Sequence, residues 1–350
     1  MRKRRRGKRY KIVSLNIMPK RSAHLGKRYK VVNKFKFVRS ITVLLIILIA
    51  IIALITSIIN KVTGTTEEEK VAESMPQNKS ENVTQEVTSN GVRAIDNTEE
   101  ENKVQTLIDS IKQTNNLNED NFAFFYRNID TGANYLFNEN KFFTAASTVK
   151  VPLSMLYYDK IRNGELTEES TLIYGKDDYE AGSGTTDYTY SVGDSIPISF
   201  LMEQAIINSD NTATNILIDG IGKEEYRRQI AKYSNRTLPD EFFNSNITSA
   251  GYADDVIRYL AEHQSDYAKL IEDMKKSSNG EYLKAQIPDY EVAHKYGDYE
   301  GNIHDYGIIY GKNTYLIGVF TSGVPNAKAL IEDIGKRVVD TVESEWISLK

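Results

Sequence analysis

A serine and a lysine three residues apart are the residues of this chain whose types and spacing most directly suggest chemistry. Ser147 and Lys150 lie in FFTAASTVKVPLSMLYY, where the later apolar residues repeat with the period of a buried helix. Positions i and i+3 share a helix face, so the lysine amine can lie within reach of the serine hydroxyl. A lysine whose pKa is lowered by burial can take the hydroxyl proton and make the serine a nucleophile. The pair predicts attack on an acyl carbon, although S-x-x-K alone is a weak signal because both residues are common.

Two further polar motifs follow along the chain. The triplet SDN at residues 209–211 lies between two apolar helical segments, and by itself it is typical of a helix N-cap in which Ser209 or Asp210 accepts backbone N–H bonds. The triplet KYG at residues 295–297 ends a strand-like run, and by itself it is typical of an edge-strand lysine before a turn glycine. Three such motifs in this order, on a helix, a loop and a strand, favour one shared site over chance.

With these motifs the chain resembles the class A beta-lactamase-like family of penicillin-recognising serine enzymes, whose signature is S-x-x-K, then S-D-N, then K-T-G. The resemblance covers roughly residues 105–345. It implies that Ser147 is the acylated nucleophile and that Lys150 is its proton partner. It also implies that Ser209 relays a proton to the leaving nitrogen.

The same resemblance implies a set of substrate-binding residues. Asn211 would hold the substrate amide, and Lys295 would bind the substrate carboxylate. Gly297 and Asp298 belong to this set, and the backbone N–H groups of Ser147 and Asp298 would form the oxyanion hole.

The third motif departs from the family pattern, which supplies one hydroxyl beside the lysine and another just after the glycine. This chain has Tyr296 and Asp298 at those two positions. Asp298 brings a negative charge to the place where the carboxylate of an anionic substrate is expected.

The family also carries a loop glutamate, in an R-x-E-P-E-L-N pattern, that activates the water for deacylation. The corresponding loop reads SNRTLPDEFFNSN, and aligning Arg236 and Pro239 puts Leu238 at the glutamate position. Asp240 and Glu241 are the nearby acids that remain. Without a positioned base we expect the acyl-enzyme to persist, because acylation and deacylation need separate proton transfers.

The elements that must position these motifs can be read from periodicity. Two strand-like runs, 122–129 and 133–137, flank a turn and predict a hairpin, and three more follow at 291–296, 305–311 and 313–322. Helical patterns cover residues 103–114, 147–163, 198–208, 211–218, 223–233, 251–263 and 326–348. Strands at both ends with helices between predict an α+β fold with one antiparallel sheet. The resemblance implies a five-stranded sheet flanked by helices plus a helical subdomain.

The N-terminal part has a different organisation. Residues 41–59 carry no charge and are long enough to cross roughly 30 Å of hydrocarbon as a helix. The alternative, a cleaved signal peptide, would have a shorter apolar run followed by a cleavage site. Residues 1–39 hold 16 Lys or Arg and no acid, so the positive-inside rule predicts a cytoplasmic N-terminus. We predict a basic cytoplasmic tail (1–39), a membrane helix contacting lipid (40–60), a flexible acidic linker (61–102) and an extracellular hydrolase domain (103–350).

Composition excludes several other classes. After the basic tail, 28 basic residues face all 48 acidic ones, which argues against a nucleic-acid-binding protein. The chain has no cysteine, which excludes disulfides, thiolate metal sites and cysteine nucleophiles. Four scattered histidines contain no H-E-x-x-H, so we expect neither a metal nor a cofactor. We also expect a monomer.

The sequence thus predicts a membrane-anchored extracellular serine hydrolase, with a beta-lactam as the leading substrate class. A D,D-peptidase or other cell-wall peptide hydrolase is a close alternative. A penicillin-binding sensor without turnover and a structural pseudoenzyme also remain open, the latter supported by the altered third motif.

Overall fold

The computed structural model describes residues 97–180, 184–277 and 282–347. The predicted basic tail and membrane helix, and the predicted linker up to residue 96, lie outside these residues. Within the described ranges, none of the helices has the length and apolar character that crossing a membrane requires. The first described helix, α2 (Thr98–Asn115), begins five residues before the predicted helix.

A five-stranded antiparallel sheet joins the two ends of the domain, in the order β2-β1-β9-β8-β7. Its strands are β1 (Phe122–Asn128), β2 (Asn134–Phe137), β7 (Glu291–Tyr299), β8 (Asn302–Tyr310) and β9 (Thr314–Ser322). In the register of β1 and β9, Phe125 lies opposite Gly318. A Cβ at Gly318 would stand 2.0 Å from the Phe125 ring, so the glycine makes room for that ring. The predicted five-stranded sheet is confirmed.

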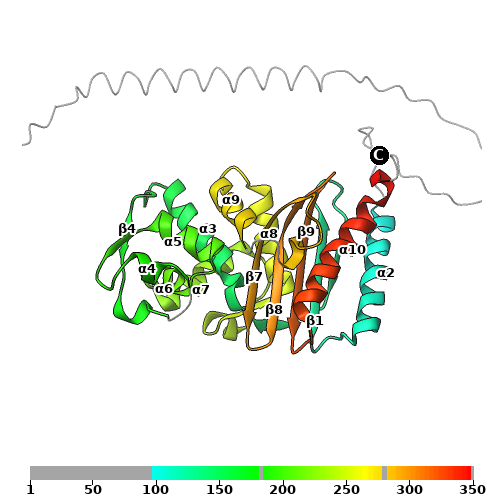
Figure 1. Cartoon of the computed structure of the whole chain (residues 1–350), viewed down its shortest axis with the longest axis horizontal. Coiled ribbons are helices and arrows are strands. Elements are labelled where there is room, and N and C mark those ends of the chain that lie inside the picture. Colours follow the sequence, from blue (N-terminus) through cyan, green and yellow to red (C-terminus); the bar gives the residue numbers. More distant parts are fainter. Residues whose placement is uncertain (1–96, 181–183, 278–281, 348–350) are drawn as a thin grey trace, which may run out of the picture. The chain divides into compact units, whose positions relative to one another are not determined.

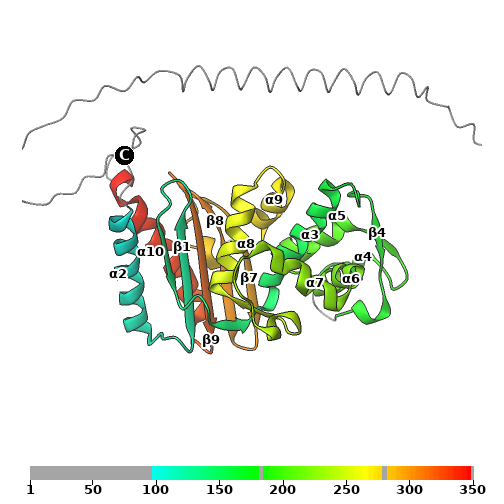
Figure 2. The same cartoon turned by 180° about the vertical axis from the view of Figure 1, so that it is seen from behind.

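The sheet separates two apolar cores. β1 reads FAFFYRN, and alternate side chains enter opposite cores, with Phe125 on one side and Phe124 on the other. Helices α2 and α10 (Ala327–Ile347) pack together on one face, and α8 (Ala250–Glu262) covers the other (Figures 1 and 2). A strand buried on both faces reads as a continuous apolar run, as β1 does.

The remaining helices form a helical part beyond the β7 edge of the sheet (Figure 1). They are α3 (Lys150–Arg162), α4 (Thr186–Thr189), α5 (Ile198–Ile207), α6 (Asn211–Ile221), α7 (Lys223–Ile230) and α9 (Ala268–Lys276). Every residue of α3 from Lys150 to Asp159 is buried, because other helices of this part surround it. This arrangement confirms the predicted α+β architecture of a sheet, flanking helices and a helical subdomain.

Three local features differ from the sequence prediction. The predicted helix 147–163 starts as a short 3₁₀ turn, η1 (Ala146–Val149), before α3 begins. Pro152 fits the first turn of α3, since the N–H that proline lacks has no intrahelical partner there. Two small sheets pair β3 (Phe142–Thr144) with β6 (Ile247–Ser249), and β4 (Thr171–Ile173) with β5 (Ser195–Pro197). Strands of three residues are too short to show a period of two, so the sequence did not predict them.

Candidate active site

Ser147 lies in η1, where the chain passes from β3 into α3. The residue is half-buried, and the preceding Ala146 has a left-handed backbone with φ of +48°. Asn246 holds this turn from both sides, since its carbonyl accepts from Ala145 N at 2.8 Å and its Nδ2 donates to the Ala146 carbonyl at 3.2 Å. The serine is therefore presented on a short, strained turn that the backbone and the side chain of Asn246, just before β6, keep in place.

Lys150 lies one turn further on and is almost completely buried. Its Nζ donates to the Ser209 carbonyl at 2.7 Å, to Ser209 Oγ at 3.3 Å and to Asn211 Oδ1 at 2.6 Å. Burial lowers the Lys150 pKa from 10.5 to about 7, although the negative charges of Asp210 and Glu180 act to raise it. Within the described residues, the hydrogen bonds of this amine go to the second motif and not to Ser147. A large fraction of Lys150 is therefore neutral near pH 7 and able to accept a proton.

The second motif lies at the start of α6, and Asp210 is its N-cap, as the pattern predicted. One carboxylate oxygen accepts from Ala213 N at 2.9 Å. The other accepts from the backbone N–H groups of Thr185 and Thr186, both at 2.8 Å, and from the Thr186 hydroxyl at 2.7 Å. Ser209 itself has a left-handed backbone with φ of +54°. The Asp210 cap therefore also helps to build the site, because it fixes the turn that carries Ser209 and Asn211.

Lys295 lies on β7 and is completely buried, with an exposed fraction of 0%. Its Nζ donates to the Tyr296 carbonyl at 3.1 Å and lies 4.0 Å from the centre of the Tyr296 ring. Burial, and then the charge of Lys150, hold the Lys295 pKa well below its usual value. The strand is at the sheet edge as predicted, but its lysine lies beneath the surface.

Gly297 continues β7 and is not a turn residue. The strand runs to Tyr299, and the turn falls at Glu300 and Gly301, whose φ angles are +48° and +77°. A Cβ at Gly297 would stand 3.0 Å from both the Ala145 carbonyl oxygen and Ser147 N. The turn-glycine interpretation is wrong, and close approach of β7 to the nucleophile turn explains this glycine instead.

A cavity of about 410 Å³ opens where these segments meet. Four of the predicted residues line it: Ser147, Lys150, Asn211 and Asp298. The other three are Ser209, which contacts Lys150, and Lys295 and Gly297, which lie on β7. Within the described ranges, no three His, Asp or Glu side chains converge in a way that could hold a metal ion. The four predicted residues that line the cavity therefore contribute an alcohol, an amine, a carboxamide and a carboxylate to it.

Glu180 also lines this cavity, and sequence reasoning missed it. It accepts from Asn211 Nδ2 at 2.8 Å through one oxygen and from Asn215 Nδ2 at 3.4 Å through the other. The Asn211 side chain is fixed at both ends of its amide, because its oxygen accepts from Lys150 and its nitrogen donates to Glu180. A single acid in a loop, 31 residues before its partner, carries no pattern that would have revealed this contact.

The loop that would carry the deacylating glutamate reaches the cavity at its last residue, Asn246, but its acids do not line the cavity. Arg236 Nε donates to Asp255 Oδ2 at 3.2 Å and ties down the start of the loop. Leu238 is half-buried against the core, and neither it nor the exposed Asp240 and Glu241 is among the residues that line the cavity. No acid of this segment reaches the cavity in the described structure.

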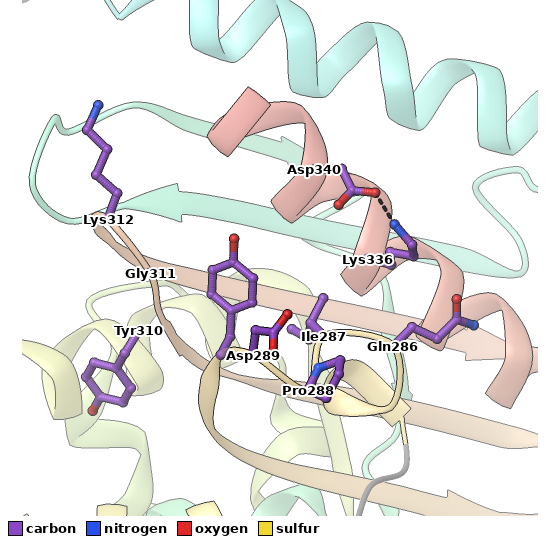
Figure 3. Close-up of a pocket in the computed structure, with 10 residues that line it drawn as sticks. Gln286, Ile287, Pro288, Asp289, Tyr310, Gly311, Lys312, Lys336 and Asp340 are labelled. Atoms are coloured by element: carbon purple, nitrogen blue, oxygen red, sulfur yellow. Dashed lines mark hydrogen bonds and ion pairs between the residues drawn. The ribbon is translucent and has the colours of Figure 1, made fainter. Parts of the chain in front are cut away.

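A second, larger cavity of about 550 Å³ lies on the other side of the sheet, beside α10 (Figure 3). Apolar groups from Ile287 and Pro288 share its wall with the paired Lys336 and Asp340 (Figure 3). It contains none of the residues of the three motifs. The smaller cavity is the better candidate, because convergent reactive groups identify a site more reliably than size does.

Comparisons with known proteins identify the family and the fold of the chain. A family model described as the beta-lactamase enzyme family matches residues 101–342, whereas none of the curated proteins matches the sequence. The solved structure of PBP-A is 23% identical, covers 69% of this chain and 96% of its own, and has a TM-score of 0.59. An acyl-enzyme complex of a PBP-A mutant with penicillin G is 23% identical, covers 71% and 97%, and has a TM-score of 0.60. A beta-lactamase from Xanthomonas campestris pv. campestris is 18% identical, covers 69% and 98%, and has a TM-score of 0.60.

Proposed function

This chain belongs to the beta-lactamase enzyme family, and we propose that it is a serine hydrolase that transfers an acyl group from an amide to Ser147. One observation carries the proposal. Lys150 is buried, has a pKa of about 7, and shares a cavity wall with Ser147 while it is bonded to Ser209 and Asn211. A buried amine with a lowered pKa beside a nucleophile in a cavity is typical of a catalytic base.

We infer the first half-reaction from the cavity wall that Ser147 and Lys150 share and from the contact between Lys150 and Ser209. Neutral Lys150 takes the hydroxyl proton of Ser147 while the oxygen bonds to the substrate carbonyl carbon. The carbon–nitrogen bond then breaks, and the leaving nitrogen takes a proton from Ser209. Lys150 returns its proton to Ser209 along the 3.3 Å hydrogen bond between them. The products are a Ser147 ester and an amine, which stays attached to the acyl group when the amide is that of a beta-lactam ring.

In the second half-reaction, water attacks the ester, restores the Ser147 hydroxyl and releases a carboxylic acid. This step needs a base for the water. Because Leu238 occupies the expected position and neither Asp240 nor Glu241 lines the cavity, we propose that the acyl-enzyme is long-lived.

A beta-lactam is the leading substrate class in this proposal, since the family is named for it. A D,D-peptidase or another cell-wall peptide hydrolase is the alternative, and the missing loop acid favours it because rapid release is not required of such an enzyme. A sensor that keeps its acyl group is a further alternative on the same ground.

Labelling tests the proposal. The full chain is incubated with a fluorescent penicillin and, separately, with a neutral thioester, and Ser147 should be acylated. Ser147→Ala should lose the label, and Ser245→Ala, a matched change on the nearby loop, should keep it. Failure of penicillin alone would remove the beta-lactam as substrate class, whereas failure of both probes would refute the acyl transfer and favour a pseudoenzyme.

We also propose that the domain lies outside the cell on a membrane anchor. The support is the apolar run 41–59 and the basic residues before it. Protease added to intact cells should remove the domain and leave the N-terminal tail protected. Digestion of the tail instead would reverse the topology.

A further inference from the structure

Two side chains of β8 form hydrogen bonds with the chain on either side of Ser147. His304 and Tyr306 are two residues apart on the strand, so they lie on the same face of the sheet. They stand opposite Gly297 and Lys295 in the register of β7 and β8. Both are buried, and neither is among the residues that line the cavity. They can therefore influence chemistry in the cavity only through the groups that they contact.

His304 is bonded to the chain before the nucleophile. Its Nε2 lies 2.8 Å from the Thr144 carbonyl oxygen, and its Nδ1 lies 3.1 Å from the Thr321 nitrogen. Because the Thr321 N–H donates to Nδ1, the ring proton is on Nε2, which donates to the carbonyl. Burial lowers the His304 pKa to about 4, so the ring keeps this neutral form near pH 7. The imidazole thus links the end of β3 to β8 and β9.

Tyr306 is bonded to the chain after the nucleophile. Its hydroxyl donates to the Thr148 carbonyl at 3.1 Å. The backbone N–H of Lys150 donates to the carbonyls of Ser147 and Thr148, so the hydroxyl reaches the point at which the turn passes into α3. The two β8 side chains therefore hold the backbone three residues before Ser147 and one residue after it.

The turn between these two contacts needs support because its backbone is strained. Ala146 has a φ of +48°, a conformation that residues other than glycine rarely adopt. Asn246 bonds to the turn from the β6 side. On the side of the sheet, Gly297 leaves room for the turn, whereas His304 and Tyr306 supply hydrogen bonds to its flanks.

We propose that His304 and Tyr306 are positioning residues for the acylation of Ser147, because together they fix the place of its hydroxyl relative to Lys150. This inference rests on the proposed function and adds two residues to its machinery. A serine displaced by a few tenths of an ångström leaves the cavity able to bind substrate but attacks more slowly. Loss of either contact should therefore lower the acylation rate constant on the order of tenfold and leave binding nearly unchanged.

A pair of matched tyrosine variants separates positioning from general stability. Tyr306→Phe removes one oxygen atom and leaves the ring in the core. Tyr157→Phe is its control, because the buried Tyr157 hydroxyl also donates to a backbone carbonyl, that of Leu217, at 2.6 Å. The two denaturant midpoints should fall by similar amounts, whereas only Tyr306→Phe should slow acylation.

A pair of histidine variants tests the second contact. The short asparagine side chain of His304→Asn can still accept from Thr321 N but cannot reach the Thr144 carbonyl. The longer glutamine of His304→Gln can place an N–H donor where Nε2 stands and so keep the bond to Thr144. Rescue by glutamine and loss with asparagine is the expected result.

Burst kinetics with the full chain supply the measurement. The probe is the N-benzoylglycyl thioester of methyl 3-mercaptopropionate, which is neutral. The burst of released thiol at increasing ester concentration gives the acylation rate constant and the half-saturating concentration independently of deacylation. We expect Tyr306→Phe and His304→Asn to lower the rate constant about tenfold, with half-saturation within about twofold of that of the unaltered chain. Tyr157→Phe and His304→Gln should stay within about threefold in both quantities.

Two results would overturn the inference while the proposed function stands. One is an unaltered rate constant in Tyr306→Phe, and the other is an equal loss in Tyr306→Phe and Tyr157→Phe, which would indicate only a loosened fold. If His304→Asn does not fold, Tyr306→Phe decides. If the unaltered chain is acylated by neither this thioester nor penicillin, the proposed function fails and the inference falls with it.

Discussion

The rate of Ser147 acylation should rise with pH through about 7 and level off above about 8. The physical reason is the Lys150 amine, which accepts a proton only when neutral. With a pKa of about 7, roughly half of it is neutral at pH 7, whereas the ordinary 10.5 would leave about 0.03%. Burial thus raises the concentration of usable base about a thousandfold, equivalent to roughly 4 kcal/mol.

Removing one nearby charge provides the perturbation. The Glu180 carboxylate raises the Lys150 pKa, so Glu180→Gln should move the inflection to lower pH. We expect acylation at pH 6, relative to the plateau, to increase about threefold. The glutamine oxygen can still accept from Asn211. Asp177→Asn, an exposed change in the same loop, is the matched control and should leave the profile unmoved.

Stopped-flow measurement of thiol release from the neutral thioester gives the acylation rate at each pH. The neutral ester is chosen because its own charge does not change between pH 5 and 9. A rate independent of pH, or an inflection near 10, would contradict the assignment of Lys150 as the base. A shift to higher pH in Glu180→Gln would contradict the electrostatic reasoning even if the base is correct.

Three further predictions concern stability and close contact. Asp210→Ala should lower the free energy of unfolding by about 3 kcal/mol, since it removes the α6 cap and leaves buried N–H donors unpaired; denaturant titration giving native stability would contradict this. Gly297→Val should slow acylation at least tenfold with a stability loss of about 1–3 kcal/mol, because its side chain would push on the Ser147 turn; a native burst rate would refute the contact. The free energy of unfolding should rise between pH 7 and 10, because unfolded Lys150 keeps a proton that the folded residue has lost, and Lys150→Met should weaken that rise; an unchanged pH slope in the variant would contradict it.

The parts of the fold that sequence could predict are the elements long enough to repeat their period several times. β8 and β9, each nine residues long, and α10 all lie where alternation or helical spacing indicated. β3 and β6 could not be predicted, because three residues show no period and their pairing joins segments about a hundred residues apart. The family predicted from the motifs is confirmed.

The candidate site also has parts that sequence could predict and parts that it could not. Local spacing predicted that Ser147 and Lys150 lie near each other, and the rules of helix capping indicated Asp210. The burial of Lys295 and the strand conformation of Gly297 depend on what packs over β7, which no local pattern reports. The catalytic roles, the membrane anchor and the extracellular location remain predictions.

Two non-glycine residues in left-handed conformation, Ala146 and Ser209, stand at the two turns that carry the reactive hydroxyls. Each such conformation costs roughly 1–2 kcal/mol, which a few hydrogen bonds from Asn246 and Lys150 offset. We therefore expect these turns to relax before the central sheet loosens. On warming, inactivation should precede melting, so heat resistance of the fold and durability of the activity are separate properties of this molecule.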